Sequence, residues 1–101
     1  MDTNMVISKK NKEEIIDRFV YELPILRTRI DMTQDEISDL IGISRQTYSS
    51  IETRKRKLTW NNYMSLLFLF YFNPATRDAV ESAGVFSDEL KKAMSVDRRR
   101  S

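Results

Sequence analysis

Signals that start helices recur along this chain, too closely spaced for one long helix to dominate it. Residues that cap helix N-termini stand at the head of six segments: Asn11, Thr33, Ser44, Thr59, Asn73 and Ser87. Asn11 and Thr33 are each followed three positions later by a glutamate, which is capping-box spacing. Gly42 and Gly84 stand where two of the segments would end. With no strand signal and no internal repeat, this spacing predicts an all-α protein of five to six short helices.

Apolar residues inside the segments follow the helical period. The first stripe recurs at intervals of three or four and consists of Ile15, Phe19, Leu23, Leu26 and Ile30. Pro24 interrupts it, and a proline inside a helix costs roughly 3 kcal/mol. We therefore expect a kinked helix over about residues 12–30, or two short helices that meet near residue 22.

Composition narrows the range of functions. The 101 residues suit one domain, and they include neither cysteine nor histidine. Disulfides, cysteine-ligated metals and histidine catalysis are therefore excluded, and the remaining polar residues form no catalytic cluster. We expect no enzyme activity, no cofactor and no metal. The longest apolar run, Tyr63–Phe72, is half a membrane span, and the N-terminus does not resemble a signal peptide, so we expect a cytoplasmic protein and no membrane.

The net charge is only +2, but the charge is unevenly distributed along the chain. Residues 11–43 contain four basic and eight acidic residues, whereas residues 44–57 contain five basic and one acidic. A basic block in an acidic background is typical of a surface that binds phosphate groups. A solvated basic loop is the alternative explanation for this block considered alone.

The segment 33–52 has the pattern of two short helices joined by a tight turn. Ser38 is small enough for the helices to approach closely, and Gly42 sits in the turn. The apolar residues that would face a shared core are Ile37, Ile41, Ile43, Tyr48 and Ile51. The opposite face of the second helix carries Arg45, Gln46, Ser49 and Ser50, short or polar side chains that suit a helix in the DNA major groove.

On these residues the sequence resembles the Cro/C1-type (XRE-like) helix-turn-helix family, mostly bacterial and phage transcriptional regulators. The match is carried by Leu26-Arg27, Thr33-Gln34, Gly42, Ser44–Thr47 and Glu52, and it extends to about Phe70. Arg54 and Leu58 stand where the family usually has glycine and proline. The resemblance implies a lambda-repressor-like domain over 12–72 and a C-terminal helical extension over 73–96. A flexible N-terminus (1–11) and a basic tail (97–101) would flank them.

The resemblance also implies roles for individual residues. Base-reading residues would be Arg45, Gln46, Ser49 and Ser50. Phosphate-contacting residues would be Gln34, Thr47, Arg54, Lys55, Arg56 and Thr59. Arg27 and Glu52 would form an ion pair that locks the recognition helix to the first helix. The alternatives are a solvated Arg45 and a Glu52 that pairs loosely with the basic loop 54–57.

These features together predict a sequence-specific double-stranded DNA-binding regulator, a repressor that occupies a palindromic operator as a homodimer. An antitoxin that autoregulates its operon fits the sequence as well, and a protein-interaction module that kept only the fold is a further alternative. Phe68, Leu69 and Phe72 lie beyond the core face expected for residues 60–72. The segment 73–96 must cover them, either as part of the chain's own core or as a dimer interface.

Overall fold

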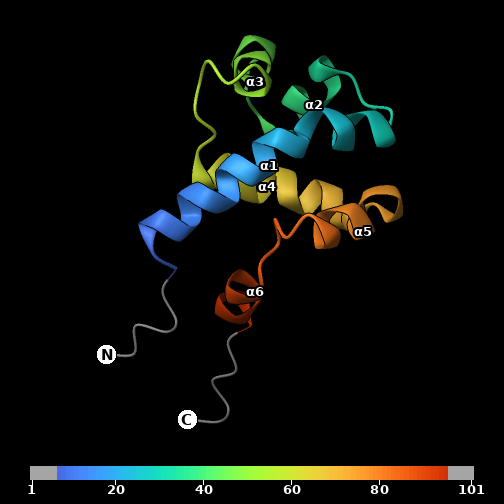
Figure 1. Cartoon of the computed structure of the whole chain (residues 1–101). Coiled ribbons are helices and arrows are strands. Elements are labelled where there is room, and N and C mark those ends of the chain that lie inside the picture. The colour runs from blue at the N-terminus through green and yellow to red at the C-terminus, as the bar shows by residue number, and fades with distance from the viewer. Residues whose placement is uncertain (1–6, 96–101) are drawn as a thin grey trace.

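The computed structural model describes residues 7–95, which form six helices and no strand. The helices are α1 (Lys9–Arg29), α2 (Gln34–Ile41), α3 (Arg45–Glu52), α4 (Trp60–Phe72), α5 (Pro74–Ser82) and α6 (Asp88–Met94). Figure 1 shows α1 and α4 in the middle of the molecule, with α2 and α3 on one side and α6 on the other. The predicted all-α fold is confirmed. The first six residues and the predicted basic tail 97–101 lie outside the described residues.

The first helix differs from the sequence-based prediction. It is one helix that begins at Lys9, and its N-cap is Ser8, whose side chain accepts a hydrogen bond from the Asn11 N–H. Of the two predicted alternatives, one helix that passes through Pro24 is confirmed, and two helices that meet near residue 22 is wrong. The predicted start near residue 12 and the Asn11 cap are also wrong. Pro24 lies inside the helix at an exposed position. The helix continues past it because the apolar stripe on the opposite face is buried, and such packing outweighs local propensity.

The other predicted caps are present, with one exception. Thr33 forms a full capping box with Glu36, and Ser44, Thr59 and Ser87 each accept a hydrogen bond from the first turn of their helix. Asn73 precedes α5, but its side chain makes no cap there and donates instead to the carbonyl of Leu69 at the end of α4. These short polar contacts fix where α2, α3, α4 and α6 begin.

The core is built around aromatic residues of α1 and α4. The ring of Phe19 meets the ring of Tyr63 edge-on, with centroids 5.1 Å apart, and the Tyr63 hydroxyl donates to the carbonyl of Val85. The segment after α4 completes this core, since Val80, Val85 and Leu90 are buried. Phe68 and Phe72, by contrast, are 70% and 69% exposed. No part of residues 7–95 covers them.

Gly42 ends α2 in the left-handed region, at φ 83°, and its N–H reaches the carbonyls of Ser38 and Asp39. A Cβ placed there would meet no atom within 4 Å, so a substitution would strain only the backbone. We expect Gly42→Ala to lower the free energy of unfolding by about 1–2 kcal/mol. Gly42→Asn should lose less, because asparagine tolerates this conformation. Urea unfolding measures both, and an alanine variant as stable as the parent would contradict the expectation.

Candidate nucleic-acid interface

The helices α2 and α3 pack as one rigid pair. Ile37, Tyr48 and Ile51 are buried between them and the rest of the core, and Ser38 is 3% exposed with its hydroxyl donating to the carbonyl of Asp35. The turn after α2 is closed by a hydrogen bond from the Ile43 N–H to the carbonyl of Ser38. Burial on one side of α3 leaves its opposite side free to face outward.

The four predicted base-reading residues lie on that outward side. Arg45 and Gln46 are exposed, and Ser49 and Ser50 are half-buried. Arg45 has one polar neighbour, Asp35 of α2, with 3.5 Å between Nε and Oδ1. Both side chains are exposed, so this contact holds Arg45 only weakly. The outward face of α3 is thus polar and cationic at its N-terminal end.

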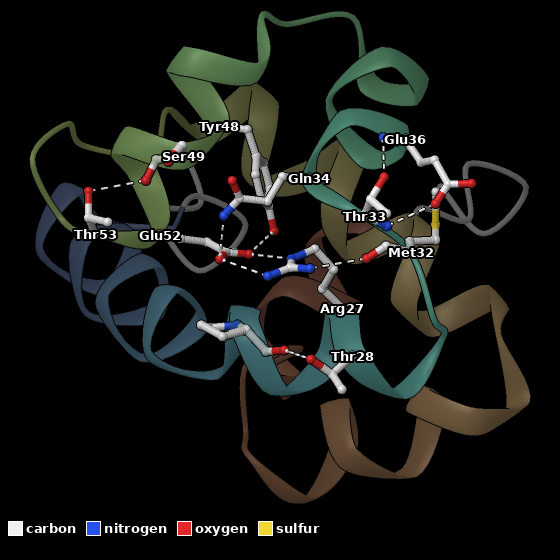
Figure 2. Close-up of polar contacts among 11 residues, drawn as sticks. Arg27, Thr28, Met32, Thr33, Gln34, Glu36, Tyr48, Ser49, Glu52 and Thr53 are labelled. Carbon is white, nitrogen blue, oxygen red and sulfur yellow. Dashed lines mark hydrogen bonds and ion pairs between the residues drawn. The ribbon is translucent and has the colours of Figure 1, made fainter.

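The single carboxylate in α3, Glu52, points inward to a polar cluster that joins three helices (Figure 2). Arg27 of α1 donates to it through two nitrogens, with Nε 2.8 Å from Oε2 and Nη2 3.2 Å from Oε1. The Tyr48 hydroxyl donates to Oε2 at 2.6 Å, and the Gln34 amide of α2 donates to Oε1 at 3.0 Å. Arg27 also donates to the carbonyl of Met32 at 3.1 Å. Glu52 therefore pairs with Arg27 and not with the basic loop.

The cluster is well shielded from water. The side chain of Glu52 is 6% exposed and that of Arg27 is 20% exposed. Burial would raise the pKa of Glu52, but the hydrogen bonds from Arg27, Tyr48 and Gln34 outweigh it and hold the pKa below its ordinary value. The pKa of Arg27 is raised, chiefly by the hydrogen bond to Glu52. Burial and the neighbouring carboxylate raise the pKa of Tyr48, so its hydroxyl stays a donor.

Two residues that donate hydrogen bonds to Glu52 were not predicted to do so. Gln34 was predicted only as a phosphate contact, yet the structure gives it a hydrogen bond to Glu52. Tyr48 was predicted only as a core residue, and its ring is buried while its hydroxyl serves the cluster. A signal was present for Tyr48, because it precedes Glu52 by four residues and such residues are neighbours on a helix.

The loop between α3 and α4 holds the remaining predicted phosphate contacts. Arg54 adopts φ 65°, the left-handed conformation for which glycine is preferred, and its guanidinium lies 5.1 Å from the ring centre of Tyr21. The N–H groups of Lys55 and Arg56 both bind the carbonyl of Ser50, and both side chains are exposed. Leu58 is buried. The loop therefore keeps a tight turn without glycine and leaves the cationic side chains of Lys55 and Arg56 exposed beside α3.

Two further predicted phosphate contacts are exposed or half-exposed at helix starts. Thr59 is exposed and its hydroxyl accepts the Asn62 N–H as the cap of α4. Thr47 is half-buried, and its hydroxyl oxygen accepts a hydrogen bond from Ser44. Both hydroxyls therefore already have a role within the protein.

The Arg27–Glu52 pair should matter strongly for stability. Arg27→Met leaves a buried carboxylate without its cation, and we expect it to lower the free energy of unfolding by about 3–5 kcal/mol. Adding Glu52→Gln to the same chain removes the stranded charge, so the double variant should recover part of this loss. Chemical denaturation of the parent and both variants measures the effect. An Arg27→Met chain as stable as the parent would contradict it.

The lowered pKa of Glu52 predicts a pH dependence. The unfolded chain binds the Glu52 proton more tightly than the folded one, so the stabilisation is complete above the ordinary value of 4.5 and is lost as the pH falls through the folded value. We expect the stability difference between the parent and Glu52→Gln to be constant above about pH 5 and to shrink below it. Urea titrations at a series of pH values test this. A difference that grows on acidification would count against it.

Comparison with known proteins agrees with this geometry. Residues 25–59 match the helix-turn-helix family model, from the last part of α1 through α3 to the cap of α4. No curated protein and no solved structure matches the chain. Within residues 7–95 no helix is long and apolar enough to cross a bilayer, and no group of residues could hold a metal ion. Residues 25–59 therefore carry a helix-turn-helix domain of the Cro/C1 (XRE-like) type, a domain typical of DNA-binding regulators.

Proposed function

We propose that this protein is a sequence-specific transcriptional repressor that acts in the cytoplasm by occupying an operator in double-stranded DNA. The observation that carries the proposal is the outward face of α3, where Arg45 and Gln46 are exposed. The one carboxylate of that helix, Glu52, points away from this face and is neutralised by Arg27. A protein-interaction module that had lost DNA binding is expected to carry acidic residues on this face, where α3 has Arg45 and Gln46.

In the proposed complex α3 enters the major groove with its N-terminal end toward the bases. The Arg45 guanidinium matches the two acceptors of guanine, and the Gln46 amide matches the acceptor and donor of adenine. Ser49 and Ser50 are short and let the helix approach the base edges. The Glu52 cluster holds α3 at one angle to α1 and α2, which keeps these contacts in register.

Phosphate groups on either side of the groove would be held by the remaining predicted residues. Lys55 and Arg56 are free for this role, and Arg54 flanks them beside Tyr21. Gln34 donates one amide hydrogen to Glu52 and keeps the second for a phosphate. Thr47 and Thr59 lie at the starts of α3 and α4, where free N–H groups also favour anions.

A repressor that acts by occupancy must compete with the transcription machinery for a defined stretch of DNA. One copy of α3 reads only a few base pairs. Two copies related by a two-fold axis would place their recognition helices about 34 Å apart and would read a palindromic operator. We therefore include a homodimer in the proposed function.

Removing a base-reading side chain should change specificity. We expect Arg45→Ala and Gln46→Ala each to lose about 1–3 kcal/mol of discrimination at particular base pairs, on operator sites chosen by selection from random duplexes. Met94→Ala, on α6, is a matched control that should leave the preference unchanged. Fluorescence titration with single-base variants of the selected site measures the discrimination. A neutral Arg45→Ala variant, or a parent that binds no duplex at low salt, would refute the proposed function.

Removing a loop cation should have a different effect. Lys55→Gln or Arg56→Gln should weaken binding to all sequences alike and lower the slope of log affinity against log salt by about 0.9 per lost phosphate contact. Lys92→Gln, which removes one exposed charge from α6, is the control and should leave the slope unchanged. Titrations across a range of salt concentrations give these slopes. An unchanged slope in both loop variants would contradict the predicted phosphate contacts.

A further inference from the structure

One outward stripe of α4 is unusual for a helix that faces water. Asn61, Ser65, Phe68 and Phe72 are spaced by four, three and four residues, so they share one face, and all four are exposed. The rings of Phe68 and Phe72 lie against each other with centroids 5.4 Å apart. These two adjoining phenylalanines, each about 70% exposed, form an apolar patch on the surface of the described residues.

The surroundings of this stripe are also apolar. Met64 and Leu69 are half-buried and flank it on its two sides along α4. The sequence from Leu58 to Thr76 contains no charged residue, in a chain of which 32% is charged. The outer face of a surface helix is ordinarily charged or polar, and apolar patches of this kind mark sites of association.

We propose that this α4 stripe is a homodimer interface, in which α4 of one copy packs antiparallel against α4 of a second copy about a two-fold axis near Ser65 and Phe68. When this uncharged face of one copy meets the same face of a second copy, no like charges are brought together. An acidic or basic partner protein would find no opposite charge on it. A two-fold contact needs one self-complementary patch, and the small Ser65 one turn before Phe68 gives a partner phenylalanine room.

The area available is consistent with such a contact. A fully covered aromatic side chain buries about 150–250 Å². Because Phe68 and Phe72 are about 70% exposed, the pair would newly bury about 200–350 Å² in each copy, between a quarter and a half of the roughly 800 Å² per partner that is usual for a stable complex. Met64 and Leu69, on the two flanks, add apolar area to the same face. The phenylalanine pair would form the centre of the interface and the flanks its margin.

This proposal differs from the expectation that the last two helices share the interface. Val80, Val85 and Leu90 are buried in the chain's own core and cannot reach a second copy. The proposal extends the proposed operator binding, because a second copy supplies the second recognition helix. The dimer interface does not need DNA to form, so experiments can refute the interface and the proposed operator binding separately.

Crosslinking tests the position of the axis, because the natural chain has no cysteine. Ser65→Cys puts one thiol at the centre of the stripe, and Ser82→Cys puts one at an exposed position of α5 as the matched control. Under mild oxidation we expect the Ser65→Cys chain to form disulfide-linked dimers at least about 10-fold faster than the Ser82→Cys chain, because packing holds the two thiols together. Equal rates would overturn the proposed axis.

Sedimentation tests the interface itself. The parent should be a dimer without DNA, and Phe68→Glu should weaken dimerisation by about 100-fold, because it sets two like charges against each other in an apolar contact. Met94→Glu changes an equally exposed apolar residue of α6 and should have no effect. A parent that stays monomeric at high concentration, or equal effects of the two variants, would overturn the proposal.

Binding to a duplex that contains a single half-site shows whether the DNA-binding proposal or the dimer proposal is at fault. The Phe68→Glu chain should bind a half-site with the affinity of the parent protomer, since its recognition helix is untouched. A parent that sediments as a dimer but does not bind the half-site would refute the proposed function and leave the dimer interface in place. A monomeric parent that binds half-sites would refute only the dimer interface. Circular dichroism of each variant checks that it is folded.

Discussion

The ion pair between Arg27 and Glu52 is the constraint on which the orientation of α3 depends. A carboxylate at the C-terminal end of α3 opposes the dipole of that helix and would repel DNA if it faced outward. Arg27, Tyr48 and Gln34 together donate four hydrogen bonds to it, so it can be buried. Since the donors come from α1, α2 and α3, the hydrogen bonds that neutralise the Glu52 carboxylate also fix the relative positions of these three helices.

Features that depend on a few neighbouring residues could be predicted from the sequence. The caps of α2, α3, α4 and α6 follow from single side chains and the N–H groups beside them, and the turn at Gly42 follows from the backbone freedom of glycine. The pairing of Arg27 with Glu52 could be expected only through the family resemblance. Nothing in the local sequence says which of several cations a glutamate will meet.

Features that depend on packing between distant segments were missed. Burial of the opposite face carries α1 through Pro24, so no local rule could decide between the predictions of one helix and of two. The start of α1 at Lys9 depends on the Ser8 cap, a local signal that the prediction of an Asn11 cap overlooked. The hydrogen bond from Gln34 to Glu52 needs the distance between α2 and the end of α3. Arg54 takes a left-handed conformation that its residue type disfavours, and its contact with Tyr21 across the chain helps to offset the strain.

The unbroken course of α1 has a mechanical consequence. Its first turn contacts α6 through Asn11 and Glu89, while its last turns hold α3 through Arg27. Asn11 and Arg27 are 16 positions apart, so about 24 Å of continuous helix joins the two attachments. A tilt of about 5° at one end therefore moves the other by about 2 Å, which is enough to break a hydrogen bond. The positions of α6 and of α3 are therefore coupled through α1, although the two helices lie at its opposite ends.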